Sequence, residues 1–167
     1  MADGHDVVAV TALLGRPPRA DFDVVVRDAA GAPVVVRNAP FTADGTPMPT
    51  RYWLVGEVAG RVARLESAGG VRAATDAVDP AALQAAHHRY ALERDAAIPP
   101  GHCGPRPSGG VGGTRTGVKC LHAHYAHFLA GGDDPVGRWV DRALASDGPH
   151  AASTSPPGHR SGGGGGR

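Results

Sequence analysis

Short apolar runs alternate with turn-forming residues in the first part of the chain. Two β-branched runs, at residues 23–27 and 33–37, are separated by Asp28-Ala-Ala-Gly31, an interval of hairpin length. Valine favours extended backbone, and Asp and Gly favour turns. The pattern therefore predicts a β-hairpin.

Elsewhere the apolar positions recur three and four residues apart, which is the period of an amphipathic helix. Such segments span residues 6–14, 57–67, 79–97, 117–131 and 135–145, and Gly or Pro ends most of them. The valines of the first segment also permit a strand. Asp79-Pro80 and Asp134-Pro135 supply a capping carboxylate and a first-turn proline. Together, the predicted hairpin and helices indicate an α+β domain over residues 6–146, in which a small β-hairpin packs with four to five helices.

The composition changes after Ser146, where Gly, Ser and Pro predominate and the chain runs into five consecutive glycines. Such a segment has too little apolar side-chain area to offset the entropy lost on ordering. We expect residues 147–167 to be a disordered tail.

Charge and cysteine content narrow the class of protein. The chain has 17 basic and 16 acidic residues, so no global field draws it to nucleic acid or to an anionic membrane. No apolar run approaches the roughly 20 residues that span a bilayer, and the N-terminus lacks the basic start of a signal peptide. We expect a cytoplasmic protein in which Cys103 and Cys120 are free thiols or metal ligands.

A glycine-rich loop runs into a thiol and three imidazoles between residues 109 and 127. In a helix, Cys120, His124 and His127 share one face, whereas an extended segment would place Cys120, His122 and His124 on one side. Zinc binds Cys sulfur and His nitrogen, so these four residues are candidate metal ligands with zinc as the possible cofactor. The chain has no Cys-x-x-Cys pair or His-Glu-x-x-His helix to strengthen this hypothesis.

The same loop could cradle an anion, because glycines let backbone N–H groups approach a phosphate. It is neither a Walker loop, since Val118 separates Gly117 from Lys119, nor a dinucleotide fingerprint. The candidate anion-binding residues are Arg51, Arg106, Ser108, Gly110, Gly112, Gly113, Thr114, Arg115 and Lys119.

Two further interpretations remain open. Cys120 could act as a nucleophile if Lys119 and His124 lowered its pKa. Alternatively, the glycines form a plain loop and the histidines have structural roles, as expected for His87 on the apolar face of its helix. Whether the protein is an enzyme is left open.

Several motifs resemble those of one bacterial family. They are Thr11-Ala-Leu-Leu-Gly-Arg-Pro-Pro-Arg19, Asn38-Ala-Pro-Phe41, Asp44-Gly-Thr-Pro-Met-Pro-Thr-Arg-Tyr-Trp-Leu54, the glycine loop from Gly104 to Arg115, and Gly117-Val-Lys-Cys-Leu-His-Ala-His-Tyr-Ala126. Over residues 6–145 the chain resembles the family of domain of unknown function 501 (DUF501). The resemblance implies no particular activity. Its actinobacterial members often lie near genes for a septum-formation initiator and an exopolyphosphatase-type enzyme.

The chain departs from this family where members often carry further cysteines. It has Val55-Gly56-Glu57 after the Tyr-Trp-Leu stretch, and Asp28-Ala-Ala-Gly31 in the hairpin turn. If those thiols were shared metal ligands, this chain lacks them. Of the candidate metal ligands, only Cys120, His122 and His124 belong to the sequence pattern that resembles the family.

We therefore expect a polar site, formed by residues 104–127 with Arg51, that binds a small anionic ligand or a metal ion. The alternative is a non-catalytic protein-interaction module that serves cell division and has a division protein as its partner. It would use Tyr52, Trp53 and the tail, although core packing is the simplest role for those two aromatic side chains.

Overall fold

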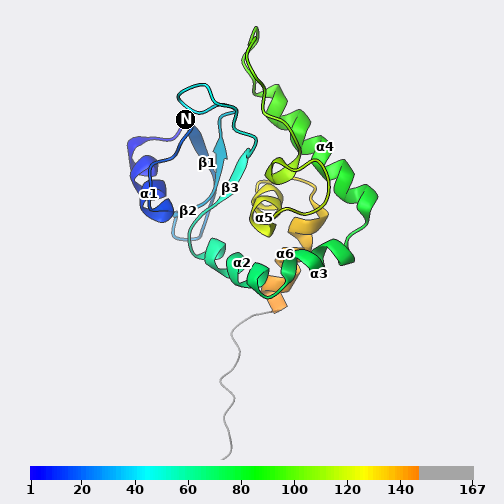
Figure 1. Cartoon of the computed structure of the whole chain (residues 1–167). Coiled ribbons are helices and arrows are strands. Elements are labelled where there is room, and N and C mark those ends of the chain that lie inside the picture. The colour runs from blue at the N-terminus through cyan, green and yellow to red at the C-terminus, as the bar shows by residue number, and fades with distance from the viewer. Residues whose placement is uncertain (147–167) are drawn as a thin grey trace, which may run out of the picture.

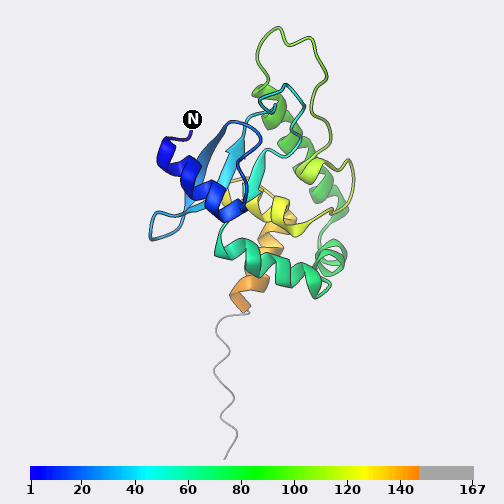
Figure 2. The same ribbon diagram turned by 60° about the vertical axis from the view of Figure 1, so that its left-hand side comes forward.

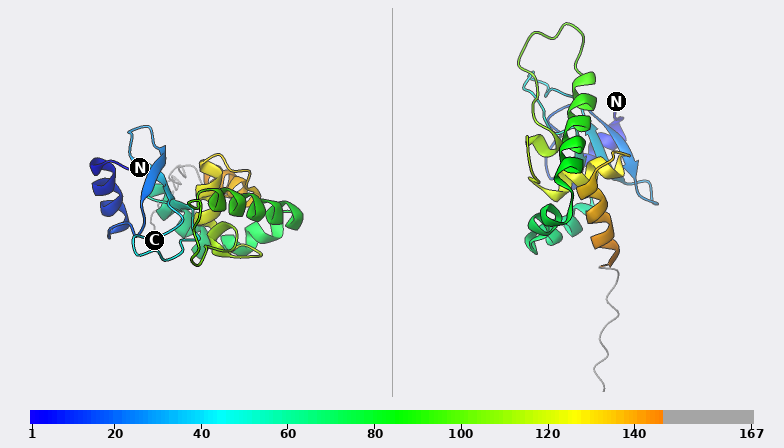
Figure 3. Two further views of the ribbon diagram at one scale, coloured as in Figure 1. Left: turned by 90° about the horizontal axis from the view of Figure 1, so that it is seen from above. Right: turned by 90° about the vertical axis from the view of Figure 1, so that its right-hand side faces the viewer.

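A three-stranded antiparallel sheet in the order β1-β2-β3 separates one helix from all the others (Figures 1 and 3). The computed structural model describes residues 1–146. The elements are α1 (Gly4–Leu14), β1 (Phe22–Arg27), β2 (Pro33–Asn38), β3 (Tyr52–Leu54), α2 (Glu57–Ser67), α3 (Gly70–Ala77), α4 (Pro80–Ala96), the short 3-10 helix η1 (Val111–Gly113), α5 (Leu121–Leu129) and α6 (Pro135–Ser146). The α+β class is confirmed. The predicted disordered tail, residues 147–167, lies outside the described residues.

The predicted hairpin is formed by β1 and β2. Asp28 Oδ1 accepts hydrogen bonds from the N–H groups of Ala30 and Ala32, and Gly31 adopts φ 84° to close the turn. The third strand, β3, was not predicted. It pairs with β2 through Val35↔Leu54, Val36↔Trp53 and Arg37↔Tyr52.

The sheet has a separate apolar cluster on each face, because successive side chains of β2 point to opposite sides. Val36 packs with Val10 of α1 and with Val55. Val35 belongs to the larger cluster, which includes Val62 of α2 and Leu121 of α5. The edge strand β3 therefore lies between α1 on one side and the helical layer on the other (Figure 1).

Helix α3 was missed because Gly69-Gly70 was interpreted as the end of a helix followed by a loop. Helix α2 does end there, and Gly69 takes the left-handed conformation with φ 89°, but the chain enters α3 immediately. A side chain at residue 70 would place Cβ 2.6 Å from Leu65 O, so the sharp turn between the helices requires glycine.

The start of α5 differs from the predicted position near Gly117. Gly117 has φ 66°, and Cys120 is extended with φ −154° and ψ 149°, so the helix begins only at Leu121. The alternative of an extended segment through Ala123 is also wrong, because residues 121–129 are helical. Cys120 is therefore the N-cap residue of α5 and does not share a helical face with His124 and His127.

The loop between α4 and η1 projects from the body of the molecule beyond the end of α4 (Figure 2). Cys103 lies on this loop, exposed and unpaired, and Cys120 is unpaired and half-buried. The two cysteines are not joined to each other by a disulfide, as expected from the sequence. No helix within residues 1–146 is long and apolar enough to cross a membrane.

Candidate functional site

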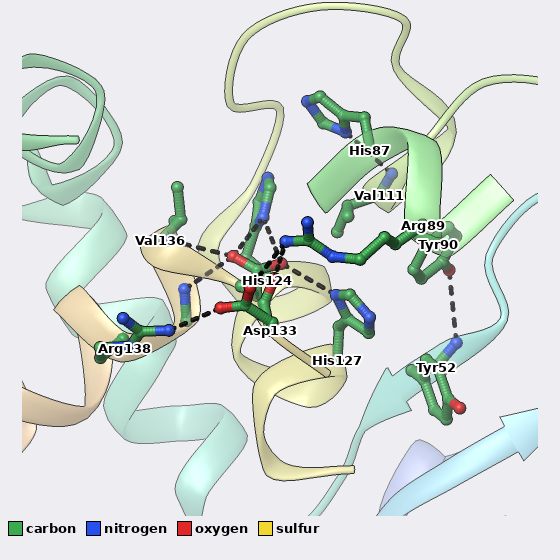
Figure 4. Close-up of polar contacts among 12 residues, drawn as sticks. Tyr52, His87, Arg89, Tyr90, Val111, His124, His127, Asp133, Val136 and Arg138 are labelled. Carbon is green, nitrogen blue, oxygen red and sulfur yellow. Dashed lines mark hydrogen bonds and ion pairs between the residues drawn. The ribbon is translucent and has the colours of Figure 1, made fainter. Parts of the chain in front are cut away.

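Two of the predicted histidines meet a buried carboxylate at the junction of α5 and α6 (Figure 4). Nδ1 of His124 lies 2.8 Å from Asp134 Oδ2, and Nδ1 of His127 lies 3.1 Å from the same oxygen. The three residues are 0–3% exposed. Asp134 Oδ1 also accepts hydrogen bonds from Val136 N and Gly137 N, each at 3.0 Å, and so caps α6.

The charge of Asp134 is stabilised by these contacts. Burial by itself would raise the pKa of this carboxyl group, but the hydrogen bonds from His124 and His127 outweigh it and hold the pKa well below the ordinary value of 3.8. Because the carboxylate accepts from both Nδ1 atoms, each imidazole keeps its Nδ1 protonated. The trio joins α5 to α6.

Aromatic rings enclose this trio on the side of the sheet. The ring of His127 stacks on Tyr52 with a centroid distance of 5.8 Å and meets the ring of Tyr90 edge-on at 5.2 Å. Gly132 is required here, since a Cβ at this residue would lie 2.2 Å from His127 Nε2. Nε2 of His124 is buried and has no hydrogen-bond partner among the described residues. The close packing gives the trio the character of a core polar network.

His87 on α4 holds the glycine loop in place. Its Nδ1 accepts a hydrogen bond from Val111 N at 3.0 Å, and its Nε2 donates to Gly117 O at 3.0 Å. Burial lowers the pKa of His87 below the ordinary 6.5, so the neutral tautomer that both bonds need is favoured. About two turns further along the same face of α4, buried Arg94 donates to Gly109 O at 2.6 Å. The sequence-based expectation of a hydrogen-bonded core residue agrees with this geometry.

The loop requires glycines because of close contacts and of backbone conformations that other residues rarely adopt. A Cβ at Gly110 would lie 2.5 Å from the His87 ring, and Gly109, Gly112 and Gly113 all have positive φ. The N–H groups of Gly110, Gly113 and Thr114 are already bonded to carbonyl oxygens within the loop. These three amides of the predicted anion cradle therefore have no free N–H to offer a ligand.

His122 points away from the other histidines, towards α2. Its Nδ1 lies 3.1 Å from Glu66 Oε1, and its Nε2 lies 3.1 Å from Ala59 O. The same Glu66 oxygen accepts hydrogen bonds from the N–H groups of Leu121 and His122. Glu66 thus supplies the cap that Cys120 does not provide, and His122 fastens α2 to the start of α5.

The four predicted metal ligands consequently lie in three different environments. Among residues 1–146, the one group of three potential ligands with donor atoms within 4.8 Å of one another is Asp3, His5 and Asp6. Asp3 and His5 are exposed, and Asp6 already pairs with Arg27 at 2.8 Å, so the group has the features of an ordinary helix N-terminus.

A cavity of about 490 Å³ lies at the edge of the sheet, where β3 meets α1, α2 and α5. This volume is within the usual range for small-molecule sites. The lining is formed by Leu13, Leu14, Thr50, Tyr52, Trp53, Leu54, Val55, Gly56, Ala59, Gly112, Lys119, Cys120, His122 and Ala123. Four of these, Gly112, Lys119, Cys120 and His122, are residues predicted from the sequence to form a site.

The polar groups of this cavity are few and come mostly from one segment. Lys119 is exposed and is the single lysine of a chain that otherwise uses arginine. Next to it, burial raises the pKa of the Cys120 thiol above the ordinary 9.0 and outweighs the amide groups of Ala123 and His122. The neutral thiol is therefore part of the apolar wall. Neither the raised pKa of Cys120 nor the position of His124, whose Nδ1 faces Asp134, supports the hypothesis of an activated Cys120 nucleophile.

The remaining predicted anion ligands are dispersed. Arg51 lines a different cavity of about 310 Å³ together with Arg37 and Asp23, and its Nη1 donates to Asn38 O at 2.8 Å. Ser108 and Arg115 are exposed on the surface, as is Arg106 on the projecting loop. Asp134 and Glu66 were missed as site residues. The capping role of Asp134 was visible in the sequence, but its contact with histidines across the turn was not.

The chain was compared with protein families, curated proteins and solved structures. No curated protein and no solved structure matched the chain. A family match covers residues 24–142, which include the sheet from Val24 onward and almost all of the helical layer. The chain belongs to the family described as protein of unknown function (DUF501).

Proposed function

We propose that the protein binds a small amphipathic anion in the cavity between α1, β3, α2 and α5. The observation that carries this proposal is the distribution of polarity in the lining. Leucine, valine, alanine and tryptophan side chains make up half of the lining residues, while Lys119 offers a positive charge just before the start of α5. Ligand sites commonly combine an apolar surface with a few placed polar groups.

The apolar part of the ligand would displace water from Leu54, Trp53 and the aliphatic side chains of α1. Removing apolar surface from water favours binding by about 25 cal/mol per Å². The protonated Cys120 thiol contributes to this wall as a weakly polar group. The carboxylate or phosphate of the ligand would lie near the Lys119 ammonium group, where opposite charges attract.

The glycine loop forms one wall of the cavity and is held in place by residues of α4. His87 and Arg94 hold the glycine loop, and Gly112 forms part of the wall, where a Cβ would lie 3.5 Å from the Ala123 side chain. A side chain at residue 112 would therefore project towards the space that the ligand occupies. The glycine loop serves the proposed function as a wall of the cavity.

Calorimetric titration of the full chain with decanoate and with decan-1-ol tests the proposal. Wild-type protein should bind one decanoate, and bind it more tightly than decanol. Lys119→Ala should weaken decanoate binding about two- to fivefold, as expected for an exposed ion pair, and leave decanol binding unchanged. Arg72→Ala is the matched control, because Arg72 is exposed on α3 and lines none of the cavities described.

Ala59→Leu provides a second test of the location. Ala59 is a partly exposed helical residue of α2 that lines the cavity, so leucine would fill the space without replacing a core side chain. Binding of both probes should fall. If neither probe binds the wild-type chain, or if Ala59→Leu binds both as tightly as wild type, the proposal is wrong.

A protein-interaction surface is a second candidate, favoured by the exposure of large apolar side chains. Trp53 is 41% exposed and Leu13 is 45% exposed, and both line the cavity. Residues of this kind are typical of interface centres. Sedimentation of the wild-type chain and of Trp53→Ser over a range of concentrations tests whether the surface mediates self-association; identical monomeric behaviour of the two would argue against it.

A further inference from the structure

A second cavity adjoins the first at the last turn of α1. It has a volume of about 310 Å³ and lies where the hairpin meets the start of α2. Leu13, Val55 and Gly56 line both cavities. These three residues therefore form the partition between two compartments at one edge of the sheet.

Of these three residues, only Leu13 has a side chain that can change its conformation or be replaced without disturbing the core. Val55 is 2% exposed and belongs to the core between α1 and the sheet. Gly56 has no side chain. Leu13 is 45% exposed and belongs to the last turn of α1, and this end of the helix lies close to the start of α2 (Figure 2). Its side chain is the part of the partition that can change without disturbing the core.

The two compartments also differ in chemistry. The second one is lined in part by Asp28, Glu57 and Arg61, whereas the neighbourhood of Leu13 in the first is aliphatic. In a series of ligands whose head group lies near Lys119, hydrocarbon chains of increasing length would first fill the apolar compartment. A longer chain would then meet Leu13, and beyond it a polar compartment that still holds the apolar side chains of Val34 and Val58.

We propose that the ligand is a straight-chain carboxylate or a similar hydrocarbon-chain anion, and that Leu13 sets the longest chain that the site accepts. This inference rests on the proposed function, because it assumes that the first cavity is the binding site. The head group lies near Lys119, the chain follows the wall formed by Trp53 and Leu54, and the chain terminus abuts Leu13.

The dependence of affinity on chain length provides the test. Each buried methylene should strengthen binding about fourfold, so the affinities of hexanoate, octanoate, decanoate, dodecanoate and tetradecanoate should rise steeply and then level off. In Leu13→Ala the rise should continue for at least two further methylenes, while the shortest chains bind as in wild type. Leu92→Ala is the matched control, because Leu92 is a 58% exposed leucine on α4 that lines neither cavity.

The outcomes separate this inference from the proposed function. If wild type binds the carboxylates but Leu13→Ala levels off at the same chain length, Leu13 is not the length determinant, although the proposed function stands. If wild type shows no increase of affinity with chain length, the ligand class is wrong. If wild type binds no member of the series, the proposed function fails and the inference fails with it. Circular dichroism of Leu13→Ala should match wild type, since alanine favours the helix at this half-exposed position.

Discussion

Asp134 lies 2.8 Å from Nδ1 of His124, and neither side chain is in contact with solvent. The contact joins residues ten positions apart across the turn between α5 and α6. The same carboxylate caps α6 through the N–H groups of Val136 and Gly137. One side chain therefore contacts the Nδ1 atoms of two buried imidazoles and also caps the first turn of a helix.

Replacing Asp134 by alanine should strongly destabilise the fold. The change leaves two buried imidazole N–H groups and two helix N–H groups without their acceptor. Removing one partner of a buried charged contact typically costs about 3–5 kcal/mol. Urea denaturation, followed by circular dichroism, measures the free energy of unfolding.

Asp133→Ala is a matched control for this experiment, since it removes the adjacent carboxylate. Asp133 is exposed and pairs with Arg89 and Arg138 on the surface, where ion pairs contribute about 0–1 kcal/mol. Equal losses in the two variants would contradict the role assigned to Asp134.

The stability of the protein should depend on pH through His87. Burial lowers the pKa of this imidazole in the folded state below the ordinary 6.5, so below pH 6.5 the unfolded chain binds more protons than the folded chain. The stabilisation is complete above pH 6.5 and is lost as the pH falls from 6.5 through the lowered pKa. Protonation of Nδ1 would also break the hydrogen bond from Val111 N.

Urea denaturation between pH 8 and pH 5 measures this dependence. The contribution of one histidine has a slope of at most about 1.4 kcal/mol per pH unit. His87→Gln should be less stable than wild type at pH 8 and should lose less stability on acidification, whereas His88→Gln, which changes an exposed neighbour, should follow wild type. A wild-type slope retained in full by His87→Gln would contradict the assignment.

Two glycines within helices should respond to alanine in opposite directions. Gly137 of α6 packs against α5 so closely that a Cβ would lie 2.3 Å from Phe128 Cβ and 2.6 Å from His124 O. Gly137→Ala should therefore destabilise the protein by about 1–3 kcal/mol, as expected for overpacking. At Gly60 of α2 the nearest atom to a Cβ is the end of the Arg64 side chain at 3.9 Å. Gly60→Ala should stabilise the protein by about 0.5–1 kcal/mol, and thermal unfolding of both variants compares the signs.

Strong local signals account for the elements that could be predicted from the sequence. The β1–β2 hairpin was indicated by its two valine runs and turn, and α4 by Asp79-Pro80 and its apolar stripe. Strand β3 was missed because three residues carry no period, and its pairing with β2 depends on a loop of 13 residues folding back. Helix α3 was missed because a glycine pair, which usually ends a helix, here permits a sharp turn between two helices.

In the candidate site, too, the residues of one segment could be identified from the sequence, whereas residues that tertiary packing brings together could not. Residue types drew attention to residues 109–127, and Gly112, Lys119 and Cys120 do line one cavity. The grouping of Cys120 with His124 and His127 failed because Gly117 and the extended Cys120 delay the start of α5. Leu13 of α1 and Ala59 of α2 could not be assigned to the site from sequence, since only tertiary packing brings them to it.

Cys120 should react slowly with thiol reagents compared with Cys103. Burial raises the pKa of the Cys120 thiol above 9.0, so little thiolate exists near neutral pH, and the cavity wall restricts access to it. Cys103 is exposed on the projecting loop. Alkylation by iodoacetamide, measured by mass spectrometry, should be much faster in Cys120→Ser, which retains Cys103, than in Cys103→Ser, which retains Cys120. The alkylation rate of Cys120 should still be rising with pH at pH 9. Saturating decanoate should slow the alkylation of Cys120 further and leave that of Cys103 unaffected.

Rapid alkylation of Cys120 at pH 7 would contradict this prediction. It would show that the Cys120 thiolate is stabilised, and would support a role for this residue as a nucleophile.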